Sequence, residues 1–188
     1  MDHAAEAVHR TLEELDATFD HVAAAPRERG VVQHLAVRPD VDRRETREEV
    51  ELTLEDGVVG DNWRVRGSTR TPDGSARPEM QITIMNARSA EAICGARENW
   101  ATAGDQFFVD LDLSEANLPP GTRLRLGSAL VEVTEVPHTG CAKFSKRFGS
   151  AALRFVNSER GRAANLRGVN ARVVEPGRVR VGDAISKA

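Results

Sequence analysis

The sequence predicts a mainly β protein, a closed or nearly closed barrel with an N-terminal helix and short peripheral helices. Two observations support this fold class. Short apolar segments alternate with a period of two, and Gly- or Pro-containing turn signals separate them; only a few segments have helical periodicity. A chain of 188 residues is long enough for one domain with its own core. We divide it into an N-terminal amphipathic helix, residues 1–29, and a barrel domain, residues 30–188.

The N-terminal helix is predicted over residues 4–25. Apolar residues recur there at spacings of three and four, which place them on one helical face: Val8, Leu12, Leu15, Phe19 and Val22. Pro26 and Gly30 end the pattern. We expect this face to pack on the barrel or across a homodimer.

Strands are predicted over residues 31–37, 50–54, 81–85 and 107–113. Residues 60–78 are rich in Gly, Arg, Ser, Thr and Pro, and they indicate a long loop of the kind that is often functional. A helix is expected over 86–100, with Cys94 on its apolar face. Segments 123–126 and 130–136 should form a hairpin, residues 144–158 a helix, and 171–174 and 179–181 a second hairpin around Pro176-Gly177.

The composition excludes several classes of protein. The net charge of −3 argues against a dedicated nucleic-acid binder, which would carry a basic excess. The two cysteines, Cys94 and Cys141, make neither a disulfide framework nor a zinc pattern, so we expect reduced thiols in the cytoplasm. No apolar run approaches the length of a membrane span, and no signal peptide is evident.

Cys141 is the most informative residue for chemistry. It follows a predicted strand and precedes a predicted helix, whose positive N-terminal end favours thiolate over thiol. Lys143 and a protonated His138 would act in the same direction. A thiolate can ligate a soft metal or carry sulfur as a persulfide. The residues alone leave a second interpretation open, a structural cysteine in a loop with solvated charges.

Four segments together resemble the MOSC family, the domain found at the C-terminus of molybdenum-cofactor sulfurases and in stand-alone bacterial proteins. They are Val59-Gly60-Asp61, Met80-Gln81-Ile82-Thr83, Gly140-Cys141-Ala142-Lys143-Phe144, and the run from Arg167-Gly168-Val169-Asn170 through Pro176-Gly177 to Gly182-Asp183. Their order and spacing match over roughly residues 30–185. One turn departs from the pattern: many relatives have Gly-Glu-Asn where this chain has Gly104-Asp105-Gln106.

The resemblance implies a strand-rich MOSC-type barrel that binds molybdenum cofactor (molybdopterin) or transfers sulfur. Cys141 would then be the metal ligand or sulfur carrier, and His138 a proton donor near neutral pH. The residues expected to contact the cofactor are Lys143, Asp61, Arg64, Arg66, Arg167 and Arg172. No lysine can be assigned to PLP, so a cysteine desulfurase or an electron-donor protein would be the partner.

A second hypothesis belongs to another class of protein. The chain would be a non-catalytic module that binds a small molecule or a protein and has kept the barrel without the cofactor. Molybdenum analysis of the purified protein separates the two hypotheses.

Overall fold

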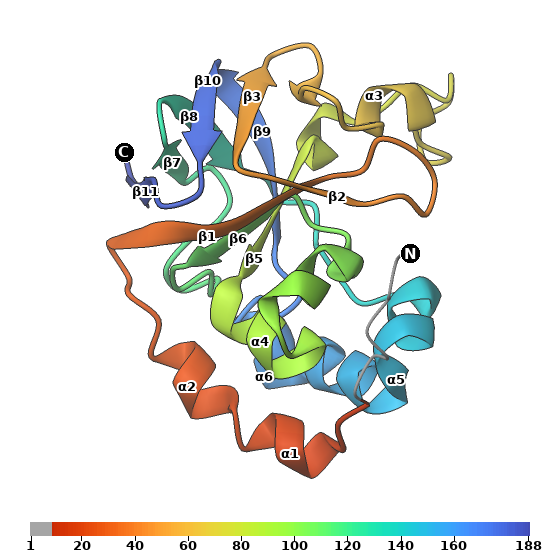
Figure 1. Ribbon diagram of the computed structural model, residues 1–188, viewed down its shortest axis with the longest axis vertical. Coiled ribbons are helices and arrows are strands. Elements are labelled where there is room, and N and C mark those ends of the chain that lie inside the picture. Colours follow the sequence, from red (N-terminus) through yellow and green to blue (C-terminus); the bar gives the residue numbers. More distant parts are fainter. Residues whose placement is uncertain (1–8) are drawn as a thin grey trace.

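The computed structural model describes residues 9–188. Seven strands close into a barrel in the order β11-β7-β8-β9-β5-β6-β1, and β1 pairs with β11 to complete the ring (Figure 1). All neighbouring pairs are antiparallel except β5 and β6. The strands are β1 (Arg29–Val37), β5 (Ile82–Asn86), β6 (Phe107–Asp110), β7 (Arg123–Leu126), β8 (Ala129–Val133), β9 (Val169–Glu175) and β11 (Ala184–Lys187).

A smaller sheet lies at one end of the barrel, shown at the top of Figure 1. It has the order β10-β3-β4, and its strands are β3 (Glu49–Thr53), β4 (Gly57–Val58) and β10 (Gly177–Arg180). The short β2 (Glu45–Arg47) pairs with the end of β1. Between β4 and β5 come α3 (Trp63–Arg66) and the 3-10 turn η1 (Pro78–Met80), both within the segment expected to be a loop or at its end.

Most helices gather at the other end of the barrel (Figure 1). They are α1 (Leu12–Asp16), α2 (Phe19–Ala23), α4 (Ala87–Cys94), the 3-10 helix η2 (Arg97–Ala103), α5 (Ala142–Asn157) and α6 (Glu159–Ala163). Their apolar faces make a second core against the barrel, separate from the core inside it. The alternation along the strands explains this arrangement: Phe107 faces the barrel interior and Phe108 faces the helices.

Three predicted elements are interrupted or placed differently. The helix expected over 4–25 breaks after Asp16, where the hydroxyl of Thr18 donates to the carbonyl of Leu15 at 2.6 Å and competes with the helical bonds. Leu15 and Val22 are buried as expected, while residues 4–8, including Val8, lie outside the described residues. The helix expected over 86–100 splits into α4 and η2 at Gly95.

The predicted C-terminal hairpin is wrong. β9 pairs with β5 and β8 in the barrel, whereas β10 leaves the barrel and pairs with β3. Gly177, the first residue of β10, lies against the backbone of Ser128 and Ala129, where a Cβ atom would come within 2.6 Å of it. The turn at Pro176-Gly177 therefore directs the chain between two sheets.

Candidate functional site

The site is centred on the turn Gly104-Asp105, between η2 and β6. The Asp105 carboxylate is completely buried and meets two partners. Its Oδ2 atom accepts from Nη1 of Arg167, and its Oδ1 atom lies 2.8 Å from Nε2 of His138. Arg167 also donates to the carbonyl of Ala103 at 2.9 Å, and its guanidinium lies over the ring of Phe144 at 5.1 Å. We call Asp105, His138 and Arg167 the buried triad.

The charges within the buried triad fix its protonation. Burial alone disfavours an ionised carboxylate, but Arg167 and His138 outweigh it and lower the pKa of Asp105 to about 2. Burial, reinforced by the cation of Arg167, lowers the pKa of His138. His138 is therefore neutral at pH 7, and the protonated histidine expected beside Cys141 is not the state that this environment favours.

A second ion pair ties the Gly60 loop to the same turn. Arg38, at the end of β1, holds the buried Asp61 through two bonds, Nε to Oδ2 at 2.8 Å and Nη2 to Oδ1 at 2.9 Å. The remaining nitrogen of Arg38, Nη1, donates to the carbonyl of Gly104 at 3.0 Å. Asp61 also accepts from the backbone of Trp63 at the start of α3. Asp61 thus orients Arg38, rather than the arginines of its own loop.

More guanidinium groups surround this turn. A Cβ atom built on Gly104 would lie 3.8 Å from Nη2 of Arg44 and 3.9 Å from Nη1 of Arg147. Burial and then the neighbouring cations lower the pKa of Arg44, and burial followed by Arg38 lowers that of Arg66. We call this cluster the arginine face: Arg38, Arg44, Arg66 and Arg147.

The arginine face has too few anions to neutralise it. Asp61 is already paired with Arg38. Among the described residues, the exposed Asp42 is the only carboxylate within ion-pair distance of Arg147, at 3.3 Å. Arg44 forms no ion pair within residues 9–188, and its buried Nε atom has no hydrogen-bond partner there. The cluster is therefore a positively charged surface with an unused donor.

Cys141 is exposed and is the N-cap residue of α5. The loop before it is clamped, because Gly140 N donates to the amide oxygen of Asn157 at 3.0 Å and the Asn157 amide donates back to Gly140 O at 3.1 Å. This contact joins the two ends of one helix. The two ends can meet because α5 bends at Gly149, where φ is 87°. The same helix carries the exposed Lys143, the buried Phe144 beneath Arg167, and Arg147 of the arginine face.

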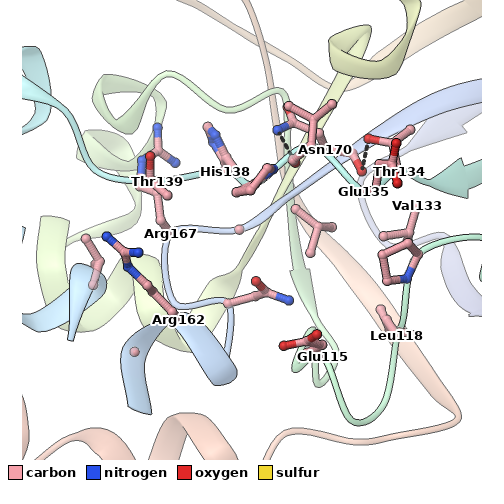
Figure 2. Close-up of a pocket in the computed structure, with 18 residues that line it drawn as sticks. Glu115, Leu118, Val133, Thr134, Glu135, His138, Thr139, Arg162, Arg167 and Asn170 are labelled. Carbon is pink, nitrogen blue, oxygen red and sulfur yellow. Dashed lines mark hydrogen bonds between the residues drawn. The ribbon is translucent and has the colours of Figure 1, made fainter. Parts of the chain in front are cut away.

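A cavity of about 270 Å³ adjoins the buried triad (Figure 2). His138, Thr139, Arg167 and Asn170 contribute to its walls, and Figure 2 shows Glu115 and Arg162 on the side away from Asn170. Its apolar walls include Leu118, Val133, Val156 and Val169. A cavity of this size could hold a small molecule beside the triad.

The structure brings together only some of the predicted site residues. His138 and Arg167 meet at Asp105, and Asp61 joins the same turn through Arg38. Arg66 approaches Arg38, and Cys141 and Lys143 begin the helix that contacts both clusters. Arg64 and Arg172 point elsewhere: Arg64 pairs with Glu55 and Asp56, and Arg172 pairs with Glu132 on the exposed side of β9.

Two arginines of the site, Arg38 and Arg44, and the pairing role of Asp105 were not predicted from the sequence. The turn Gly104-Asp105 was noted only as a departure from the family pattern. No group of three or more His, Cys, Asp and Glu side chains among residues 9–188 forms a cluster that could hold a metal ion by itself. None of the described helices has both the length and the apolar character needed to cross a bilayer.

Comparison with known proteins gives a family and a fold. The model of the MOSC domain matches residues 73–186, more than half of the chain. The fold is similar to that of the YuaD protein from Bacillus subtilis, with a TM-score of 0.61 and 17% identity over 84% of this chain and 94% of that one. It is also similar to YiiM from Escherichia coli, with a TM-score of 0.55 and 17% identity over 84% and 69%. No curated protein matches the sequence.

Proposed function

The chain belongs to the MOSC domain family, and from that premise we propose that it binds a pterin molybdenum cofactor between Cys141 and the arginine face. The observation that carries this proposal is the positive charge around Gly104, where Arg44 has no ion-pair partner among residues 9–188 and Arg147 lies on the helix that the exposed Cys141 begins. When bound, the cofactor would supply molybdenum redox chemistry or accept a sulfur atom.

The arginine face suits the phosphate group of such a cofactor. Guanidinium groups bind phosphate through two parallel charge-assisted hydrogen bonds, and Arg44 has a buried Nε donor with no partner among the described residues. Arg44 and Arg147 both lie near one point above Gly104, so one phosphate could contact both. Arg38 is held by Asp61 and donates to the carbonyl of Gly104, so it would fix the turn beneath the phosphate rather than add net charge.

Cys141 suits the metal end of the cofactor. A thiolate is a soft, anionic ligand, and Cys141 is the exposed N-cap residue of α5. Arg147 follows six residues later, roughly 9 Å along the helix axis at the usual rise per residue. The two ends of one elongated ligand could therefore meet Cys141 and the arginine face at once. Lys143, one position into the helix, adds charge beside the thiol.

Sulfur transfer is the second candidate, and the exposure of the Cys141 thiol favours it. An exposed thiol can be reached by a protein donor, so a cysteine desulfurase could load it with a persulfide. A reductase would instead need an electron-donor protein. A non-catalytic binding module, the remaining hypothesis, would need neither partner.

The test is metal and pterin analysis of protein expressed with abundant molybdate. We expect near-stoichiometric molybdenum in the wild type and its loss in Cys141→Ser, because serine is a poor ligand for a soft metal. Arg44→Met should reduce bound pterin at least about tenfold, the effect of losing one charge-assisted contact. Arg172→Met is the matched control, because that arginine pairs with Glu132 outside the site.

Two results would contradict the proposal. A wild-type protein free of molybdenum and pterin under these conditions supports the non-catalytic module. Equal pterin content in Arg44→Met and Arg172→Met would remove the arginine face from the binding site.

A further inference from the structure

We infer that Asp105 and Arg167 are positioning residues that hold His138 as a neutral proton acceptor, with its Nδ1 atom available to a weakly acidic group at the site. The inference deepens the proposed function, and it rests on that function only for what the weak acid is. The state of His138 itself follows from the geometry of the buried triad.

The hydrogen bonds of the triad determine which ring nitrogen of His138 carries hydrogen. Asp105 is ionised, and an ionised carboxylate can only accept hydrogen bonds. Nε2 of His138, 2.8 Å from Oδ1, must therefore be the donor. In a neutral imidazole the other nitrogen, Nδ1, then has a free lone pair. The expected role of His138 as proton donor is thereby reversed in the resting protein.

Nδ1 is open to an incoming group. It forms no hydrogen bond within residues 9–188, and the His138 side chain is 15% exposed and lines the adjoining cavity. The opposite edge of the ring faces Gly168, where a Cβ atom would lie 3.2 Å from Cδ2, so a larger residue there would crowd the ring. The ring is therefore held by Asp105 at Nε2 and has no partner at Nδ1 among the described residues.

The groups that face the triad come from several elements. Asp105 precedes β6 and stabilises the protonated imidazole, while Arg167, which precedes β9, and Arg38, which follows β1, destabilise it. Cys94 of α4 is also close enough for the charges to act on its pKa, which Asp105 raises and Arg167 lowers. Arg167 thus has two opposing effects on the protonation of His138. It keeps Asp105 ionised, which favours the imidazolium, and its own positive charge disfavours the imidazolium.

The proposed step is a single proton transfer. A weak acid at the site gives its proton to Nδ1, which leaves its conjugate base and an imidazolium. The imidazolium keeps its Nε2–H bond to Asp105, and the carboxylate stabilises the new positive charge as an aspartate does in a catalytic triad. Two weak acids share this chemistry: the thiol of Cys141, three residues along the chain, and an N–H or O–H group of a reactant in the adjoining cavity.

Nitrogen NMR of the imidazole rings tests the inference on the protein as purified. The chain has five histidines, and the His138 signals are assigned by their loss in His138→Gln. We expect the neutral Nε2–H tautomer at pH 7 and protonation only below the ordinary histidine range. An Nδ1–H tautomer, or an imidazolium at pH 7, would overturn the inference.

Two variants should move the titration of His138 in opposite directions. Asp105→Asn removes the carboxylate that favours the imidazolium, so the His138 pKa should fall, by roughly one pH unit. Arg167→Met removes the opposing cation, so it should rise, by roughly one pH unit. Arg167→Lys, which keeps the charge, should restore the wild-type titration. If Asp105 and Arg167 only supported the fold, both variants should lose order in the same way, and the His138 pKa should not shift in opposite directions.

The source of the proton is decided by alkylation of Cys141 across pH in Cys94→Ala protein. If the thiol is the source, His138→Gln should shift the rate profile to higher pH. If the profile is unchanged and the NMR result stands, a reactant in the cavity is the source. Molybdenum analysis of the same samples separates this inference from the proposed function. If the protein contains no cofactor but shows the Nε2–H tautomer, only the proposed function fails.

Discussion

The two cysteines of this chain stand in opposite environments. Cys94 ends α4 in the core between the barrel and the helices, 6% exposed. Burial first, and then the negative charge of Asp105, raise its pKa to about 12. Cys141 begins α5 and is exposed to solvent, with the loop before it clamped by Asn157. The contrast shows that burial, and then the nearby charge of Asp105, set Cys94 apart from Cys141 although the residue type is the same.

The largest expected difference between the two thiols is their rate of alkylation. At pH 7 a thiol with a pKa of about 12 is ionised in about one molecule in 100,000, and only the thiolate reacts. We expect Cys141 to be modified at least ~1,000-fold faster than Cys94, measured by mass spectrometry of the labelled peptides. Unfolding in guanidinium is the control, since it should make both thiols react at similar rates. Faster labelling of Cys94 in the native protein would reverse the comparison.

Of the two cysteines, Cys94 should be the one that lowers the stability of the fold at alkaline pH. Its pKa rises from 9.0 to about 12 on folding, so stability is fully present below pH 9 and is lost as the pH rises towards 12. The loss amounts to about 4 kcal/mol of unfolding free energy. Denaturant titrations between pH 8 and pH 11 should show a shallower decline in Cys94→Ala than in Cys141→Ala. Parallel declines in the two variants would argue that Cys94 ionises freely in the folded protein.

The stability of the fold at acid pH should depend on the buried triad. The pKa of Asp105 falls from 3.8 to about 2 on folding, so its contribution is complete above pH 4 and is lost as the pH falls towards 2. That contribution is about 2 kcal/mol. The lowered pKa of His138 adds an earlier loss that begins below pH 6.5. Asp105→Asn should be less stable at pH 7 and should lack the decline between pH 4 and pH 2; an unchanged decline would assign it to other carboxylates.

The smallest expected effect is that of serine at each cysteine. Cys94→Ser places a hydroxyl in an apolar core and should cost about 1–2 kcal/mol, measured by denaturant unfolding. Cys141→Ser changes an exposed side chain and should stay within about 0.5 kcal/mol of wild type. A larger loss at position 141 would mean that the thiol supports the fold.

Local sequence patterns predicted much of the fold. The alternation of Val50 and Leu52 with polar residues predicted β3, and the turn at Gly127-Ser128 predicted the pairing of β7 with β8. The resemblance to the MOSC family is confirmed by the family model. Pairing at long range was not encoded locally. The Pro176-Gly177 turn predicts a change of direction, but nothing in it indicates that β10 joins β3 far earlier in the chain.

The site was harder to predict for the same reason. Cys141 and His138 stand in one short segment, so spacing and the family resemblance identified them together. Arg167 and Asp105 are 62 residues apart, and Arg38 and Asp61 are 23 apart. An arginine in the sequence does not reveal which carboxylate will hold it. Arg64 and Arg172 were expected to contact the cofactor and Arg44 was not, and only the fold shows that the charges of the first two are neutralised by other carboxylates.

The position of β1 has a consequence for any shortened form of this protein. The matched family region begins at residue 73, yet β1 lies before it and pairs with both β6 and β11. A fragment that begins at residue 73 would have an open barrel with two unpaired strand edges. Such edges can pair with strands of other chains and cause aggregation. The fragment would also lack Asp61 and three of the four arginines of the arginine face: Arg38, Arg44 and Arg66. The segment that the family model leaves unmatched thus closes the barrel and carries most of the candidate ligand face.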